Sequence, residues 1–121
     1  MGFEFDNERP IYSQIVEQFE IKIASGQLVS GEKVDSVREL ASQMKVNPNT
    51  MQKAMQELEN EKLLYTERTN GRFVTKDKNL IKKYREKYAR EKTMKYLEYM
   101  RQLGFEDSET RDYLEKIGGE Q

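Results

Sequence analysis

The chain has 121 residues, of which 36% are hydrophobic and 36% are charged, and its net charge at pH 7 is −1. This length suits one small domain with its own core plus a short appendage, since domains commonly contain about 100–150 residues. The sequence contains no Cys and no His, so it lacks disulfides, thiolate chemistry, and the commonest metal ligand and general base. Most familiar catalytic sites are therefore unavailable, and we expect no metal and no cofactor.

The charges are divided unevenly along the chain. Lys and Arg outnumber Asp and Glu by seven to five in residues 36–76 and by nine to three in residues 78–101, whereas residues 1–35 and 102–121 are acidic. A local basic patch attracts a polyanion, but a charge run is more commonly a solvated helix face. The acidic N-terminus is unlike a signal peptide, and no apolar run is long enough for a membrane span, so we expect a cytoplasmic protein.

The first predicted element is an amphipathic helix. Residues 11–24 carry apolar side chains at spacings of three and four, and Gly26 is expected to end this helix. Residues 27–35 have no clear period and are interpreted as a connection. Ser36 and Glu39 then form an S-x-x-E capping box, which predicts a short second helix.

A third helix follows a tight turn at residues 45–47. Asn47 is a good N-cap and Pro48 suits the first helical position, so this helix is predicted to run from there to about Glu61. One face of it is apolar. The opposite face carries a stripe of polar side chains at offsets of three, four and seven residues: Asn49, Gln52, Lys53 and Gln56.

The segment after Leu63 changes period. Residues 64–67 and 72–75 approach a period of two, and Asn70-Gly71 between them is a strong hairpin signal, so we predict a two-stranded wing. Two short helices joined by a tight turn and followed by a hairpin present the second of those helices to the DNA major groove.

The remaining chain is predicted to form two helices. The first runs from Lys78 to about Leu103, where Gly104 is expected to stop it. Either Asp107 or Ser108 is expected to cap a short final helix, after which Gly118-Gly119 releases the tail. The fold is thus mainly α with a small β-hairpin: a winged helix-turn-helix domain over residues 1–76 and a two-helix dimerisation region over residues 77–121.

Several polar side chains have the chemistry for DNA contacts. Asn49 and Gln52 can pair bidentately with adenine, and Lys53 can donate to guanine. Arg38, at the start of its helix, can bind a phosphate or a guanine. The wing tip sets two guanidinium groups beside the turn, where one can enter the minor groove: Arg68, Asn70, Gly71 and Arg72. Each feature also has an ordinary reading, since polar helix faces are usually only solvated and Asn-Gly is usually only a turn.

Several motifs in their order resemble the N-terminal domain of the GntR family of bacterial transcription regulators, over about residues 9–76. They are Pro10-Ile11-Tyr12-Ser13-Gln14-Ile15, Gly26-Gln27-Leu28, Gly31-Glu32-Lys33, Ser36-Val37-Arg38-Glu39-Leu40-Ala41, Val46-Asn47-Pro48-Asn49-Thr50, Leu58-Glu59 and Phe73-Val74. The Asn-Pro-Asn-Thr turn and the short C-terminal appendage resemble the small YtrA subfamily, whose two extra helices mainly dimerise the protein.

The resemblance implies DNA contacts at Arg38, at the wing, and at the turn and start of the third helix: Asn47, Asn49, Thr50, Gln52 and Lys53. The chain departs from the family pattern in three places. Asp35 adds a carboxylate before the second helix, Pro48 replaces a turn arginine that many relatives carry, and residues 69–72 replace the usual Gly-x-Gly-Thr wing tip. We therefore expect phosphate anchoring to be partly redistributed, to Lys53, Arg68 and Arg72.

The long C-terminal helix carries more large apolar residues than a wholly solvated helix needs. We expect it to form a homodimer seam through Tyr84, Tyr88, Tyr96, Leu97 and Met100. The alternative for these residues is packing onto the N-terminal domain of the same chain. The predicted function is a homodimeric, sequence-specific repressor that binds an inverted-repeat operator on double-stranded DNA, with no effector identified.

Two other classes of function remain as alternatives. The first is a winged-helix module whose free helix face meets a protein without specific DNA binding. The second is an enzyme, which the sequence disfavours because Glu57, Glu59 and Glu61 scatter around a helix rather than converge.

Overall fold

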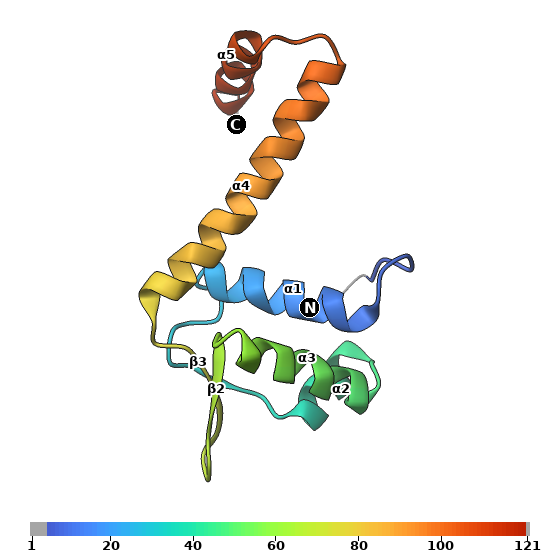
Figure 1. The fold of residues 1–121 in the computed structure, drawn as a ribbon, viewed down its shortest axis with the longest axis vertical. Helices are drawn as coiled ribbons and strands as arrows, with labels where there is room; N and C mark the ends of the chain where they lie inside the picture. The colour runs from blue at the N-terminus through green and yellow to red at the C-terminus, as the bar shows by residue number, and fades with distance from the viewer. Residues whose placement is uncertain (1–4, 121) are drawn as a thin grey trace. The chain divides into compact units, whose positions relative to one another are not determined.

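The computed structural model describes residues 5–120 and divides them into two compact units (Figure 1). The first four residues, which begin the acidic N-terminal segment, and residue 121 lie outside the described part. The first unit ends at Arg85 and the second begins at Glu86. In chain order the elements are α1 (Ile11–Ala24), β1 (Lys33–Val34), α2 (Val37–Met44), α3 (Pro48–Asn60), β2 (Leu64–Glu67), β3 (Gly71–Val74), α4 (Lys78–Gln102) and α5 (Asp107–Gly118).

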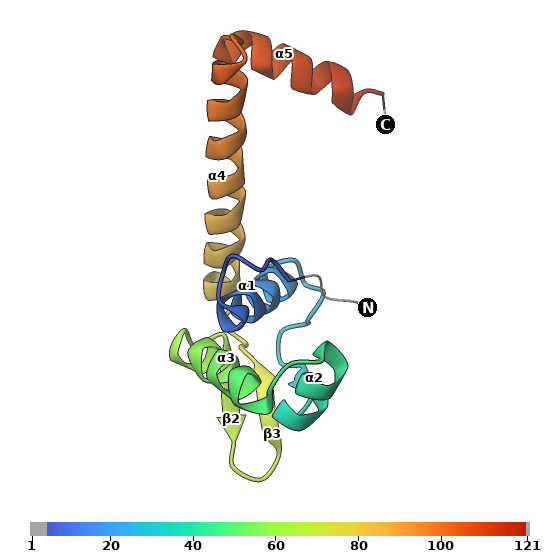
Figure 2. The ribbon, with the colours of Figure 1, turned by 90° about the vertical axis from the view of Figure 1, so that its right-hand side faces the viewer.

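The apolar faces of three short helices supply most of the core of the first unit, and residues of the sheet complete it. Helix α3 packs against both α1 and α2, and Figures 1 and 2 show α2 and α3 next to one another in a helix-turn-helix. The apolar stripes predicted from the sequence face this core. Its fully buried members include Ile15, Met51, Ala54, Met55, Leu58, Leu63 and Val74, each with 0% exposure.

Local signals set where α2 and α3 begin and end, as the sequence predicts. The Ser36 hydroxyl accepts a hydrogen bond from the Glu39 amide at 3.1 Å, and the Glu39 carboxylate accepts one from the Ser36 amide at 3.2 Å. Lys45 ends α2 in the left-handed region, with φ of 56°. The Asn47 side chain then accepts a hydrogen bond from the Asn49 amide at 2.7 Å and caps α3.

The small sheet has three antiparallel strands in the order β1-β3-β2. The hairpin of β2 and β3, residues 64–74, is the wing. The interpretation of residues 27–35 as a connection is wrong for two residues, because this segment contains β1, which pairs Lys33 with Phe73 and Val34 with Arg72. A strand of two residues is too short to show a period, and only its pairing with β3 reveals it.

The first turns of α4 belong to the first unit. Leu80, Ile81 and Tyr84 pack against the hydrophobic core, so the compact unit extends beyond residue 76, where the sequence suggested a boundary. For Tyr84 the structure therefore has the intramolecular packing that the sequence offered as the alternative to dimerisation. None of the helices in residues 5–120 is long and apolar enough to cross a membrane.

The second unit consists of the remainder of α4, from Glu86 onward, and the whole of α5. Gly104, with φ of 92°, ends the α4 segment where glycine was expected, and the Phe105 amide donates to the Met100 carbonyl at 3.0 Å. The expectation that Asp107 or Ser108 caps α5 is wrong, because the N-cap is Glu106. Asp107 is the first residue of the helix, and its carboxylate accepts two hydrogen bonds from Arg101, at 2.9 and 2.8 Å.

The second unit has almost no interior of its own. Met100 and Thr110 are its only buried residues within the described part of the chain. Phe105 and Tyr113 make an edge-to-face contact with ring centroids 5.7 Å apart. Five large apolar side chains remain exposed by between 44% and 61%: Met94, Tyr99, Leu103, Tyr113 and Leu114.

Candidate nucleic-acid interface

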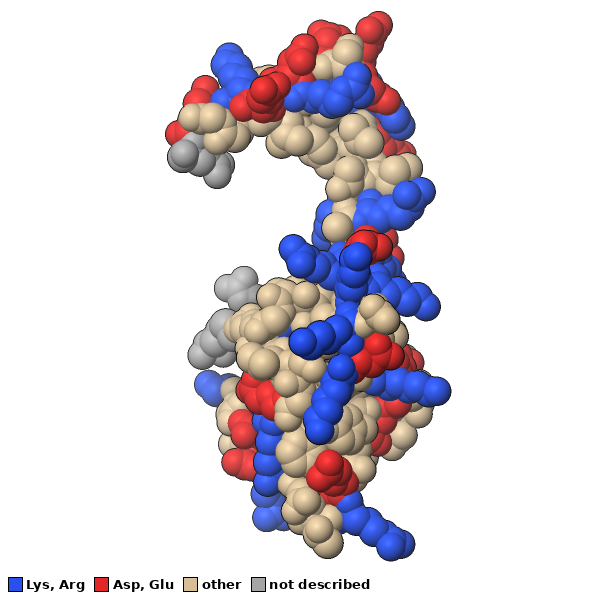
Figure 3. All heavy atoms as spheres, turned by 90° about the vertical axis from the view of Figure 1, so that its left-hand side faces the viewer, with Lys and Arg blue, Asp and Glu red and all other residues tan. Residues whose placement is uncertain are grey.

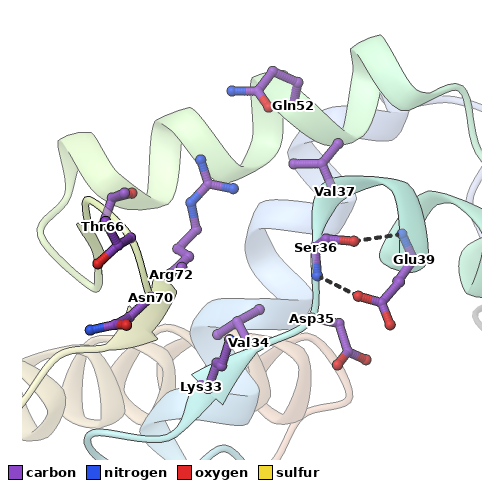
Figure 4. Close-up of a pocket in the computed structure, with 12 residues that line it drawn as sticks. Lys33, Val34, Asp35, Ser36, Val37, Glu39, Gln52, Thr66, Asn70 and Arg72 are labelled. Atoms are coloured by element: carbon purple, nitrogen blue, oxygen red, sulfur yellow. Dashed lines mark hydrogen bonds between the residues drawn. The ribbon is translucent and has the colours of Figure 1, made fainter.

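A groove of about 780 Å³ lies between the wing and the helix-turn-helix (Figure 4). Its wall on one side is the start of α2, and Gln52 of α3 reaches it from the same side. The wing and β1 supply the opposite wall, including Lys33 and Arg72. Asp35 and Glu39 also line this groove, so it carries both signs of charge rather than a uniform positive potential.

The polar face predicted on α3 is open to solvent. Asn49, Gln52 and Lys53 are exposed, as is the N-cap Asn47, while Thr50 is half-buried. The amide groups of Asn49 and Gln52 can donate and accept at once, which is the chemistry needed for the edge of an adenine.

Lys53 departs from the rest of this stripe. Its ammonium nitrogen lies 3.8 Å from the centroid of the Tyr12 ring on α1. This cation–π contact directs Lys53 toward α1, whereas Gln52 lines the groove on the wing side. The four-residue stripe read from the sequence is therefore divided in the structure, and Gln56 donates to the side chain of Asn60 at 3.2 Å.

Arg38 lies in the first turn of α2 and is exposed. Nearby, the carboxylate of Asp35 is held by a hydrogen bond from Gln43 at 3.1 Å. The Asp35 carboxylate, which departs from the family pattern, is thus part of the groove wall rather than buried in the domain.

The wing tip is a three-residue loop, residues 68–70, between the paired residues Glu67 and Gly71. Gly71 has a φ of 109°, and a side chain there would meet Lys33 at 3.0 Å. The positive φ explains why glycine occupies this position, since the end of the flexible Lys33 side chain could move aside. Arg68 and Asn70 are exposed on the loop, and Asn70 donates to the Glu67 carboxylate at 3.2 Å.

Arg72 lies at the base of the loop and behaves differently from Arg68. Its Nε donates to a carboxylate oxygen of Glu59 on α3 at 2.9 Å, and only 17% of its side chain is exposed. Figure 4 shows Arg72 extending from the wing toward α3. From the sequence, Glu59 was named in the Leu58-Glu59 motif and as one of three scattered carboxylates, but it was not paired with Arg72, because nothing local indicates a partner 13 residues away.

The residues expected at a dimer seam divide between the two units. Tyr84 packs in the first unit, and Met100 is 6% exposed within the second. Tyr88, Tyr96 and Leu97 are half-buried on α4. The sequence list omitted the more exposed residues Tyr99 and Leu103.

Basic side chains cover much of α4, whereas acidic side chains gather over α5 (Figure 3). The basic residues of α4 that the sequence predicted as a charge run thus lie on its surface. Figure 3 also shows both signs of charge on the wing. The net charge of −1 therefore conceals strong local differences.

Comparison with known proteins identifies the domain that carries this interface. The family model "Bacterial regulatory proteins, gntR family" matches residues 11–74. The chain is 34% identical, over 90% of both sequences, to the uncharacterised HTH-type transcriptional regulator YhcF of Bacillus subtilis. It is also 41% identical to the HTH-type transcriptional repressor YtrA of Bacillus subtilis, over 56% of this chain and 52% of YtrA.

Solved structures agree with these matches. A GntR family transcriptional regulator from Listeria monocytogenes is 37% identical and superposes with a TM-score of 0.84, covering 93% of this chain and 98% of that one. The DNA-binding domain of AraR in complex with operator ORX1 is 28% identical, with a TM-score of 0.55 over 62% of this chain and 95% of that one. The chain therefore belongs to the GntR family of bacterial transcription regulators, with a DNA-binding helix-turn-helix domain and no enzymatic role.

Proposed function

We propose that this chain is a homodimeric repressor that binds an inverted-repeat operator, with α3 in the major groove and the wing on the minor groove. The observation that carries the proposal is the pair of exposed amide side chains, Asn49 and Gln52, on α3. A major groove about 12 Å wide admits one helix, and amides on that helix can read adenine edges. Acting on bacterial DNA, the protein would work in the cytoplasm.

The contacts divide into two kinds. Asn49 and Gln52 are proposed to read bases, while Arg38 is proposed to bind a phosphate near the start of α2. The wing is proposed to reach the minor groove through Arg68, whose side chain is exposed at the tip. Further backbone contacts are proposed around the turn, the start of α3 and the wing loop: Asn47, Thr50, Lys53, Asn70 and Gly71.

The proposal of a homodimer rests on the second unit. Monomeric proteins rarely expose large contiguous apolar patches, and this unit leaves Tyr99, Leu103 and Leu114 exposed by 57% or more. A second copy can cover these side chains and place two α3 helices on two half-sites. Repression is proposed because YtrA, to which the chain is 41% identical over 68 residues, is named a repressor.

Selection of bound duplexes from a random pool, with the full chain, tests the proposal. We expect enrichment of an inverted repeat whose half-sites are centred about one helical turn apart, or a multiple of it. Affinity for the selected duplex should fall steeply with salt, because Lys and Arg displace phosphate counterions. Equal, millimolar affinity for every duplex at physiological salt would contradict specific binding.

Two substitutions separate the proposed kinds of contact. Arg38→Ala should weaken binding to all duplexes and reduce the slope of log affinity against log salt by about one. Gln52→Ala should change the preferred base at particular positions of the selected site. An unchanged preference for Gln52→Ala in a repeated selection would contradict base reading by this residue.

Transcription from a promoter that overlaps the selected operator tests the regulatory sign. Added protein should lower the transcript level, since a bound dimer obstructs the polymerase. A rise in transcript would contradict repression without affecting the DNA-binding proposal.

A further inference from the structure

Glu59, near the C-terminal end of α3, joins that helix to both strands of the wing. One of its carboxylate oxygens accepts hydrogen bonds from Arg72 Nε, at 2.9 Å, and from the Thr66 hydroxyl. Thr66 on β2 and Arg72 on β3 are directly opposite one another in the sheet register. A single carboxylate therefore holds a cross-strand pair against α3, and we call these three residues the wing clamp.

The ion pair within the wing clamp is substantially shielded from water, whereas Thr66 is exposed. The side chains of Arg72 and Glu59 are 17% and 20% exposed, in contrast to the exposed Arg68 at the tip. Burial by itself raises the pKa of Glu59, but the hydrogen bonds from Thr66 and Arg72 and the positive charge of Arg72 outweigh it, so the pKa is lowered. Glu59 is therefore ionised at neutral pH and neutralises Arg72.

The wing clamp lies where few other interactions hold the wing in place. β1 pairs with β3 only at Phe73 and Arg72, so the outer wing beyond this point has no third strand. A two-stranded hairpin alone is only marginally stable in water. The clamp thus acts at the last cross-strand pair before the pair of Glu67 and Gly71 that closes the loop.

We propose that Glu59 is a positioning residue for DNA binding, which orders the wing against α3 through Thr66 and Arg72 before DNA arrives. In this arrangement Arg72 is committed to Glu59 and is not a phosphate ligand, although its residue type and place in the wing suggest one. The inference rests on the proposed function, in which the wing meets DNA. An element ordered in advance loses less conformational entropy on binding.

The salt dependence of DNA affinity separates this proposal from a direct contact. Glu59→Gln retains the shape of the side chain but removes its charge. It should weaken binding to the selected duplex roughly 3- to 10-fold, which is the range expected when one or two side chains must be ordered on binding. The salt slope should not change, because no phosphate contact is lost. If Arg72 were instead a phosphate ligand restrained by Glu59, the same substitution would strengthen binding and steepen the slope.

Glu67→Gln is the matched control, because it makes the same chemical change at a carboxylate of the wing that lies outside the clamp. Removing this exposed charge near DNA should leave affinity equal or higher, opposite in sign to Glu59→Gln. Arg72→Met should weaken binding as much as Glu59→Gln, again without a change in slope. The double variant should bind DNA no more weakly than either single variant, since both substitutions remove one shared interaction. Additive losses of affinity would overturn the proposal. So would a salt slope reduced by about 0.9 in Arg72→Met, because that would indicate a lost phosphate contact.

Hydrogen exchange in the DNA-free protein gives a second measurement. Glu59→Gln should reduce protection of the amides of residues 64–74 while leaving α1 and the buried part of α3 unchanged. Unchanged protection of the wing would overturn the clamp even if affinity fell. Failure of the unaltered protein to bind any duplex would contradict the proposed function instead, and these outcomes are distinguishable because exchange is measured without DNA.

Discussion

The two units of this chain differ in how completely they bury their apolar side chains. The first unit encloses a core to which α1, α2, α3, the sheet and the start of α4 all contribute. The second has two buried residues in its described part and leaves Tyr99, Leu103 and Leu114 largely exposed. The first unit therefore buries its apolar side chains within itself, whereas the second leaves several of its own uncovered, which is the reason for proposing a second copy as their cover.

The largest effect is expected from a cavity in the core of the first unit. Leu58 is 0% exposed, and Leu58→Ala should lower the free energy of unfolding by roughly 2–5 kcal/mol, since it removes buried methyl groups and leaves a void. Leu114→Ala, at a 57% exposed position, is the control and should change the stability of the first unit very little. Denaturant unfolding measures both, and equal losses would break the contrast between the units.

An intermediate effect is expected on self-association. Leu103 is 58% exposed, and Leu103→Lys should weaken dimerisation by about 1.5–3 kcal/mol, the value of burying one leucine. Sedimentation across a range of concentrations measures this shift. Gln102→Lys adds the same charge at the neighbouring exposed polar position and should have a smaller effect; a dimer that tolerates both substitutions would place the seam elsewhere.

A smaller loss is expected at the start of α2. Ser36→Ala removes the hydroxyl that accepts from the Glu39 amide and should cost about 1 kcal/mol of stability. Ser42→Ala, within the same helix and exposed, makes the same chemical change away from the cap. Because alanine favours helix interiors, thermal unfolding should show this control to be neutral or stabilising, and a loss as large as for Ser36→Ala would argue against a specific capping effect.

The smallest effect is the pH dependence of two ion pairs, one in each unit. The pKa of Glu59 is lowered despite burial, as described, and the Arg101 hydrogen bonds, with the charges of Arg101 and Arg111, lower the pKa of Asp107 against a weaker opposing effect of desolvation. Because both folded values lie below the unfolded ones, this stability is present above about pH 4.5 and is lost as the pH falls through the folded values.

Thermal unfolding of the unaltered protein, Glu59→Gln and Asp107→Asn across pH 7 to 3 checks this sign. The stability lost in each variant at pH 7 should shrink as the pH falls. The side chains of Arg101 and Asp107 are 52% and 46% exposed, so salt should suppress the Asp107 difference more than the Glu59 difference. Differences that grow on acidification would contradict the assigned directions.

The sequence by itself determined most of the backbone of the first unit. The capping box at Ser36, the cap at Asn47 and the glycine at the wing act over a few residues, so the helix-turn-helix and hairpin are readable locally. The periods of the apolar side chains also identified which helix faces are buried. Together with the GntR-like motifs, these signals were sufficient to predict the fold class and family.

Only the tertiary structure decided features that depend on partners distant in the chain. β1 exists because Lys33 and Val34 meet β3, some 38 to 40 residues away. Lys53 turns to Tyr12, and Arg72 to Glu59, because packing brings α1 and the wing to α3. Residue type and local spacing marked both cations as candidates for DNA, but the contact that each already makes within the fold is identified only when the segments come together.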